Sequence, residues 1–200
     1  MVLASASPAR LAVLRAAGVE PVVRVSGVDE DAVAASLVDP TPDELVVALA
    51  EAKARAVLPA VAAEHRDAVV VGCDSMLLHG GELVGKPGTV ERARKRWAAV
   101  AGGTGVLLTG HAVLRTGGGA ATGTERTTVR FGQPSERELV AYLATGEPLA
   151  VAGAFTLDGL GAPFVRRVEG DPAAVVGLSL TLLRQQLAKR GLAITDLWKR

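Results

Sequence analysis

Helix-capping signals recur along the chain between short apolar segments, and this pattern is the feature that most limits its possible folds. Ser7-Pro8 and Thr89 are N-cap signals, and capping boxes begin at Thr41 and Ser135. Apolar or β-branched segments typical of strands occupy residues 2–5, 21–28, 68–72, 105–114 and 125–131. Some of these segments are joined by hairpin turns and others by helices, which favours an α/β fold on a mixed sheet.

The predicted helices have clear ends as well as clear starts. Gly18 follows the first, Gly102-Gly103 the third and Gly191 the last, where glycine can adopt the conformation that stops a helix. His79-Gly80-Gly81 predicts a hairpin turn, and Asp29-Glu30-Asp31 an acidic turn. The predicted helices cover about 8–17, 41–63, 89–101, 135–144 and 180–190. With 200 residues, we expect a single domain over 1–200.

Overall charge and cysteine content exclude several functional classes. The 22 basic and 21 acidic residues give a net charge of +1, so no global field attracts nucleic acid or membrane. Cys73 is alone and forms no intramolecular disulfide. The N-terminus lacks the basic region of a signal peptide, and no apolar run approaches the ~20 residues of a membrane span. We expect a cytoplasmic protein.

The turn before the first helix is a candidate phosphate site. The N-terminus of a helix offers unpaired N–H groups and a partial positive charge, which suit phosphate. Ser5 and Ser7 add hydroxyls there, and Arg10, one turn into the helix, adds a charged fork. Ser-Pro caps also begin many helices that bind nothing.

Asp74 follows the apolar segment 68–72 and is the second candidate. Ligands of open α/β sheets gather beyond the carboxyl ends of the strands, where an aspartate can hold a metal or take a proton from water. The alternative is a turn-capping aspartate. Cys73 is predicted to be a buried residue rather than a nucleophile, because none of the three histidines neighbours it in sequence.

Two of the five lysines lie in informative positions. Lys53 repeats the four-residue spacing of Leu45 and Leu49, which predicts a place at the rim of the core, although a snorkelling lysine fits the same pattern. Lys86 lies in the turn Gly85-Lys86-Pro87 and is either a phosphate-binding point charge or a solvated loop lysine.

An ordered set of motifs resembles the Maf family of nucleotide pyrophosphatases over nearly the full length of the chain. No single motif is decisive, and it is their order over about 160 residues that makes the resemblance specific. The matching segments are LASASPAR at 3–10, VDE at 28–30, LAEAKA at 49–54, GCDS at 72–75, GKP at 85–87, GEPL at 146–149, AGAFTLDGLGAPFV at 152–165 and VEGDPAAVVGLSL at 168–180.

The resemblance implies an elongated mixed sheet flanked by helices, with two lobes around a central cleft, as in inosine-triphosphate pyrophosphatases. It implies that water attacks the α-phosphorus of a nucleoside triphosphate and that pyrophosphate leaves. Asp74 would be the catalytic aspartate, and Glu30 would join it in holding Mg²⁺ or Mn²⁺. The phosphates would be bound by Ser7, Arg10, Lys53 and Lys86.

Three positions depart from the patterns that set base preference within the family. The branch selective for thymidine and uridine triphosphates has arginine, threonine and glutamine where this chain has Ala9, Ser75 and Asp158. The branch favouring methylated guanosine triphosphate usually has tryptophan at the position of Ala9. Ser75 and Asp158 are therefore predicted substrate-binding positions. The preferred base stays open, and the candidates include non-canonical bases, whose nucleotides a house-cleaning enzyme would hydrolyse.

Other functions fit the same pattern of residues. One is a nucleotide-binding regulator of cell division that needs no catalysis, and another is a sugar-nucleotide transferase with the same triphosphate cradle. An apolar patch of Ile194, Leu197 and Trp198 near the C-terminus suits either a homodimer interface or docking on the chain's own domain.

Overall fold

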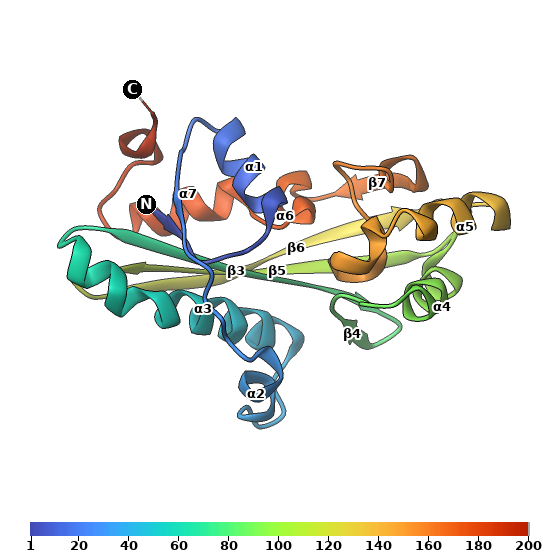
Figure 1. Ribbon diagram of the computed structural model, residues 1–200, viewed down its shortest axis with the longest axis horizontal. Coiled ribbons are helices and arrows are strands. Elements are labelled where there is room, and N and C mark those ends of the chain that lie inside the picture. Colours follow the sequence, from blue (N-terminus) through green and yellow to red (C-terminus); the bar gives the residue numbers. More distant parts are fainter. Residues whose placement is uncertain (200) are drawn as a thin grey trace. The chain divides into compact units, whose positions relative to one another are not determined.

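The computed structural model, which describes residues 1–199, is an α/β protein built on a seven-stranded mixed sheet (Figure 1). The strand order is β2-β1-β3-β5-β6-β7, with β4 paired to β3. β1 pairs in parallel with β2 and β3, whereas β3–β4 and β6–β7 are antiparallel. The predicted α/β fold on a mixed sheet flanked by helices is confirmed. The strands are β1 (Val2–Leu3), β2 (Val22–Val23), β3 (Val69–His79), β4 (Glu82–Val84), β5 (Thr104–Arg115), β6 (Ala120–Phe131) and β7 (Val165–Glu169).

The predicted caps begin the helices as expected. The side chains of Ser7, Thr41, Thr89 and Ser135 each accept a backbone N–H of the first helical turn. Thr41 and Ser135 complete reciprocal capping boxes. The α-helices are α1 (Pro8–Ala16), α2 (Glu30–Ala35), α3 (Pro42–Glu64), α4 (Val90–Val100), α5 (Glu136–Ala144), α6 (Pro172–Val176) and α7 (Leu180–Ala188), and the short 3-10 helices are η1 (Glu147–Ala150), η2 (Ala152–Ala154), η3 (Ala162–Phe164) and η4 (Ile194–Leu197).

The chain divides into two compact units. Unit 1 comprises Met1–Asp74, Thr109–Glu125 and Gly177–Arg200, and unit 2 comprises Ser75–Leu108 and Arg126–Val176. The chain passes from unit 1 to unit 2 within β3, between Asp74 and Ser75.

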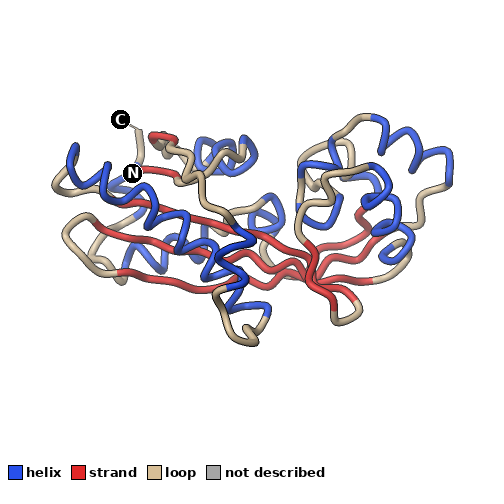
Figure 2. The backbone as a smooth tube through the Cα atoms, turned by 60° about the horizontal axis from the view of Figure 1, so that its bottom comes forward, coloured by secondary structure: helices blue, strands red, loops and turns tan. Residues whose placement is uncertain are grey.

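Unit 1 has helices on both faces of its part of the sheet. α3 lies on one face and α1 and α7 on the other (Figure 1), and the long α3 also runs along the strands in Figure 2. Side chains that alternate along each strand supply the two cores: Val70 packs with the α3 face, whereas Val71 packs with the α1 and α7 face. Such strands have no solvent face, which explains why 68–72 is apolar throughout.

Two glycines allow α3 to lie close against the sheet. A Cβ on Gly72 of β3 would be 2.1 Å from the Ala50 carbonyl oxygen. A Cβ on Gly110 of β5 would be 2.2 Å from that of Val46. Both obstacles are backbone atoms of α3, so any larger residue would push the helix away.

Aromatic rings form the core of unit 2. Trp97 of α4 is 1% exposed and meets Phe131, Tyr142 and Phe164 edge-on, with ring centroids 5.8, 6.1 and 5.9 Å away. Its indole N–H donates to the carbonyl of Ala154 at 2.8 Å. The core therefore fixes α4 against α5 and η2.

Three local predictions were wrong in extent or type. The strand expected over 21–28 is confined to Val22–Val23, whose side chains are half-exposed at the sheet edge. The acidic turn at 29–31 is instead the start of α2, with the Asp29 side chain accepting from the Ala32 N–H at 3.0 Å. The loop expected before residue 125 is shorter, because β6 begins at Ala120. No helix within residues 1–199 combines the length and the apolarity of a membrane span.

Candidate active site

The first turn of α1 presents two serine hydroxyls beside a helix N-terminus in unit 1. Ser7 accepts the Arg10 N–H at 3.3 Å, and its own N–H donates to the Ser5 hydroxyl at 3.1 Å. Proline at the first helical position starts the helix without losing an internal hydrogen bond. The end of the helix carries partial positive charge, so this turn can bind an anion.

Arg10 is anchored by a residue far away in the sequence. Its Nε donates to the Gly177 carbonyl at 2.8 Å, and its Nη1 donates to the Ser5 hydroxyl at 3.2 Å. Gly177 has a φ of 126°, and a Cβ there would lie 3.1 Å from the Arg10 Nε. Gly177 lies within the motif at 168–180, but its contact with Arg10 was not predicted, because a separation of 167 residues leaves no local signal for it.

Lys53 lies between two carboxylates. Its Nζ is 2.6 Å from Asp74 Oδ1 on β3 and 2.7 Å from Glu30 Oε1 on α2. The side chains of Lys53 and Asp74 are 10% and 9% exposed, whereas that of Glu30 is 52% exposed. The buried side of this cluster is therefore an ion pair in a low-dielectric setting, and its other side opens to solvent.

The position of Asp74 differs from the predicted one. It does not follow the end of a strand, because β3 continues through it to His79. The strand extends because Leu77, Leu78 and His79 pair with β4 in a hairpin. Asp74 is therefore held by the sheet itself and is 6% exposed.

Cys73, which precedes Asp74 in β3, is free and buried. Burial raises the pKa of its thiol to about 11, while the charges of Arg10 and Lys53 act to lower that pKa and the charge of Asp74 acts to raise it. Arg10 and the Lys53–Asp74 pair therefore lie within electrostatic range of the same thiol. A thiol with this pKa is protonated at neutral pH, which agrees with the predicted buried role and not with a nucleophile.

The predicted site residues fall into two groups. Unit 1 holds Ser7, Arg10, Glu30, Lys53 and Asp74 and brings the last three together, and unit 2 holds Ser75, Lys86 and Asp158. Their roles stay predictions.

The loop of Lys86 is held at both ends within unit 2. The Gly85 carbonyl accepts from the Gly153 N–H at 3.3 Å and from the Arg96 guanidinium, and the Gly88 N–H donates to the Leu149 carbonyl at 3.0 Å. The Lys86 side chain itself is exposed. A cation on a tethered loop is suited to binding a phosphate.

The carboxylates of the site suit a hard divalent cation. Within residues 1–199, no group of three or more His, Cys, Asp or Glu residues could hold a metal. Glu30 and Asp74 nevertheless meet at Lys53 Nζ. Mg²⁺ is typically held by one or two carboxylates together with substrate phosphates, so this pair fits such an ion when a nucleotide supplies further ligands.

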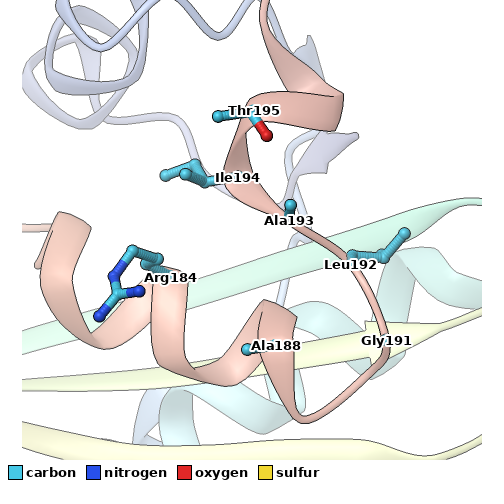
Figure 3. Close-up of a pocket in the computed structure, with 7 residues that line it drawn as sticks. All are labelled: Arg184, Ala188, Gly191, Leu192, Ala193, Ile194 and Thr195. Atoms are coloured by element: carbon cyan, nitrogen blue, oxygen red, sulfur yellow. The ribbon is translucent and has the colours of Figure 1, made fainter.

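A pocket of about 490 Å³ lies elsewhere in unit 1, between α7 and the C-terminal segment (Figure 3). Arg184 and Ala188 line it on one side and residues 191–195 on the other, and it includes none of the predicted site residues. Ile194, which lines the pocket, packs against the unit 1 core together with Leu197. Trp198 forms an isolated antiparallel bridge with Val19. Ile194 and Leu197 thus dock on the chain's own unit, whereas Trp198 is 53% exposed, and the homodimer stays a prediction.

Comparison with known proteins gives a consistent family assignment. The family model of Maf-like proteins matches residues 1–190. The chain is 63% identical to a protein of Saccharopolyspora erythraea named nucleoside triphosphate pyrophosphatase, over 98% of this chain and 96% of that protein. Proteins of the same name from Rhodococcus erythropolis and Streptomyces coelicolor are 60% and 54% identical, over 100% and 99% of this chain and 96% and 94% of those proteins. With matches of this extent, the chain belongs to the Maf family.

Proposed function

We propose that this protein hydrolyses a nucleoside triphosphate to the nucleoside monophosphate and pyrophosphate. The observation that carries the proposal is the Lys53 ammonium held between the carboxylates of Asp74 and Glu30. The name shared by its relatives supports the same reaction.

In the proposed reaction, Asp74 accepts a proton from the attacking water. The water oxygen forms a bond to the α-phosphorus, and the bond from that phosphorus to the bridging oxygen of the β-phosphate breaks. The electron pair leaves with pyrophosphate. The Lys53 Nζ donates a hydrogen bond to Asp74 Oδ1 at 2.6 Å and would orient the carboxylate toward the water.

The positive groups of the chain would neutralise the charge that develops along the triphosphate. Ser7 and the α1 N-terminus offer N–H and O–H donors, and Arg10 offers a guanidinium already oriented by Gly177. Lys86 would bind the phosphate chain as a point charge, and Ser75 would contact the substrate next to Asp74. The positive charge is concentrated at these residues, which is compatible with a net charge of only +1 for the whole chain.

We further propose a divalent cation, Mg²⁺ or Mn²⁺, held by Glu30 and Asp74. Such a cation would supply positive charge that polarises the phosphate groups and neutralises part of their charge. Glu30 is half-exposed and so is accessible to an incoming ion–nucleotide complex.

Pyrophosphate release in the presence of Mg²⁺ or Mn²⁺, measured over a panel of nucleoside and deoxynucleoside triphosphates, tests the reaction. Asp74→Asn removes the proton acceptor and should lower kcat by about 10²-fold or more. Asp67→Asn is the matched control, because Asp67 is an exposed aspartate of unit 1 that is ion-paired to Arg115. Equal rates for wild type and Asp74→Asn would refute the role of Asp74.

The same assay separates the other functions considered. A protein that binds nucleotides tightly but releases no pyrophosphate from any of them would be a regulator. Orthophosphate as the only phosphate product, or a nucleotide joined to an added sugar acceptor, would indicate a different reaction.

Asp158 is proposed to contribute to base selection. A carboxylate only accepts hydrogen bonds, so it favours bases that present N–H donors. Turnover of the nucleotide panel by Asp158→Gln should shift toward bases that present acceptors, and an unchanged profile would refute this role.

A further inference from the structure

The carboxylate of Glu147 collects three hydrogen bonds from one short loop of unit 2. Its Oε1 accepts from the Thr156 hydroxyl at 2.6 Å and from the Gly161 N–H at 3.1 Å, and its Oε2 accepts from the Leu160 N–H at 3.1 Å. Burial acts to raise the pKa of Glu147, but the hydrogen bonds from Thr156, Leu160 and Gly161 outweigh it, and the pKa lies below its ordinary value. The ionised carboxylate thus holds the loop 156–161 at neutral pH.

Two glycines let this loop come close to the carboxylate. A Cβ on Gly159 would lie 2.6 Å from Glu147 Oε2. A Cβ on Gly161 would lie 2.4 Å from the Tyr142 hydroxyl and 2.7 Å from the Thr156 nitrogen. A larger residue at Gly159 would force the loop and the Glu147 carboxylate apart, and one at Gly161 would meet the loop backbone, so the loop is shaped around Glu147.

The loop presents two exposed side chains of different chemistry. Asp158 and Leu160 lie on its solvent side, and Leu160 is 59% exposed although it is a large apolar residue. A hydrogen-bond acceptor beside an apolar surface, on a fixed backbone, suits a flat ligand that carries N–H donors on its edge.

The segment that carries Glu147 also holds the loop of Lys86. Glu147 begins η1, and Leu149 of the same helix accepts the Gly88 N–H, while Gly153 of η2 donates to Gly85. The two exposed loops of unit 2, one with a cation and one with an acceptor and an apolar side chain, therefore share one support over 147–154.

We propose that Glu147 is a positioning residue that fixes loop 156–161 so that Asp158 and Leu160 meet the nucleobase of the substrate. This inference rests on the proposed function. It assigns Glu147 to base binding and not to bond cleavage, because the groups proposed for cleavage are held by contacts within unit 1. Loss of Glu147 should therefore raise KM and blur the differences between bases, while leaving kcat unchanged.

The test uses Glu147→Gln, which keeps the shape of the side chain. Its amide N–H₂ group would face one of the loop's hydrogen-bond donors, so that hydrogen bond would be lost. Gly159→Ala is a second variant that keeps the carboxylate but sets a Cβ 2.6 Å from Glu147 Oε2, so that the loop and the carboxylate must move apart. Glu82→Gln is the control, an exposed glutamate on β4 of the same unit. For each protein, hydrogen exchange is measured at the Leu160 and Gly161 amides, together with kcat and KM over the nucleotide panel.

We expect both loop variants to speed exchange at these amides by about 10-fold and to raise KM for the best nucleotide by about 10-fold or more. The control should match wild type. An active wild type whose Glu147→Gln and Gly159→Ala variants keep KM and base profile would overturn this inference alone. A wild type without pyrophosphatase activity would overturn the proposed function, and the inference with it. Faster exchange together with a fall in kcat at unchanged KM would also overturn it, because that result places Glu147 in bond cleavage.

Discussion

Removing the Lys53 ammonium tests the centre of the candidate site most directly. Lys53→Met keeps an unbranched apolar stem but leaves Asp74, which is 6% exposed, as a buried carboxylate without its ion partner. Breaking a buried ion pair in this way costs about 3–5 kcal/mol. The pair with Glu30 adds at most about 1 kcal/mol, because the Glu30 side chain is 52% exposed and solvent screens it. We therefore expect the free energy of unfolding to fall by about 3–5 kcal/mol.

A second substitution separates the unpaired charge from the lost packing. Lys53→Met combined with Asp74→Asn removes the buried charge as well, so most of the lost stability should return. Lys189→Met is the control, because Lys189 is an exposed lysine at the end of α7, and it should stay within about 0.5 kcal/mol of wild type.

Urea unfolding at neutral pH, followed by circular dichroism, measures these differences in stability. The expected order is wild type and Lys189→Met most stable, the double variant next, and Lys53→Met least stable. Equal midpoints for Lys53→Met and the double variant would refute the reasoning, because the buried carboxylate would then cost nothing when unpaired.

Three further outcomes follow from the structure. Gly72→Ala should lower the free energy of unfolding by about 2 kcal/mol or more, because its Cβ would meet the Ala50 carbonyl at 2.1 Å, and an unchanged melting temperature would contradict this close packing. The Cys73 thiol, with a pKa raised from 9.0 to about 11, adds stability that is present below pH 9 and lost as the pH rises toward 11. It should resist thiol reagents at about pH 8 until the protein unfolds, and rapid labelling of the native protein would count against it. The pKa of Glu147 is lowered from 4.5, so its hold on the loop is complete above pH 4.5 and is lost only as the pH falls through the lowered pKa. Protection of the Leu160 amide should therefore persist at pH 4.5 and above, and its loss at neutral pH would disprove this.

Local chemistry accounts for the parts of the fold that were predictable from sequence. A capping box is completed within four residues, so the helix starts at Thr41 and Ser135 could be predicted without any information on distant residues. Both boxes form. Asp29 also caps a helix, but its acidic neighbours resembled a turn, and α2 is only six residues long. Short elements carry too little periodicity to be recognised.

Strand ends, in contrast, depend on partners. β3 continues through Asp74 because β5 lies beside it and β4 pairs with its end. β2, at the edge of the sheet, stops at Val23 because the neighbouring β1 ends at Leu3. An apolar pattern shows that a strand is buried, but hydrogen bonds to a neighbouring strand decide how far it extends.

The sequence by itself determined the α/β class, the helix starts and the identity of the residues that carry charge in an otherwise apolar setting. Only the tertiary structure decided that Lys53 joins Asp74 to Glu30, that Arg10 is held by Gly177, and that Glu147 holds its loop. The physical reason is range: caps and turns form between neighbours in the chain, whereas an ion pair or a hydrogen bond between distant residues exists only after packing has brought them together.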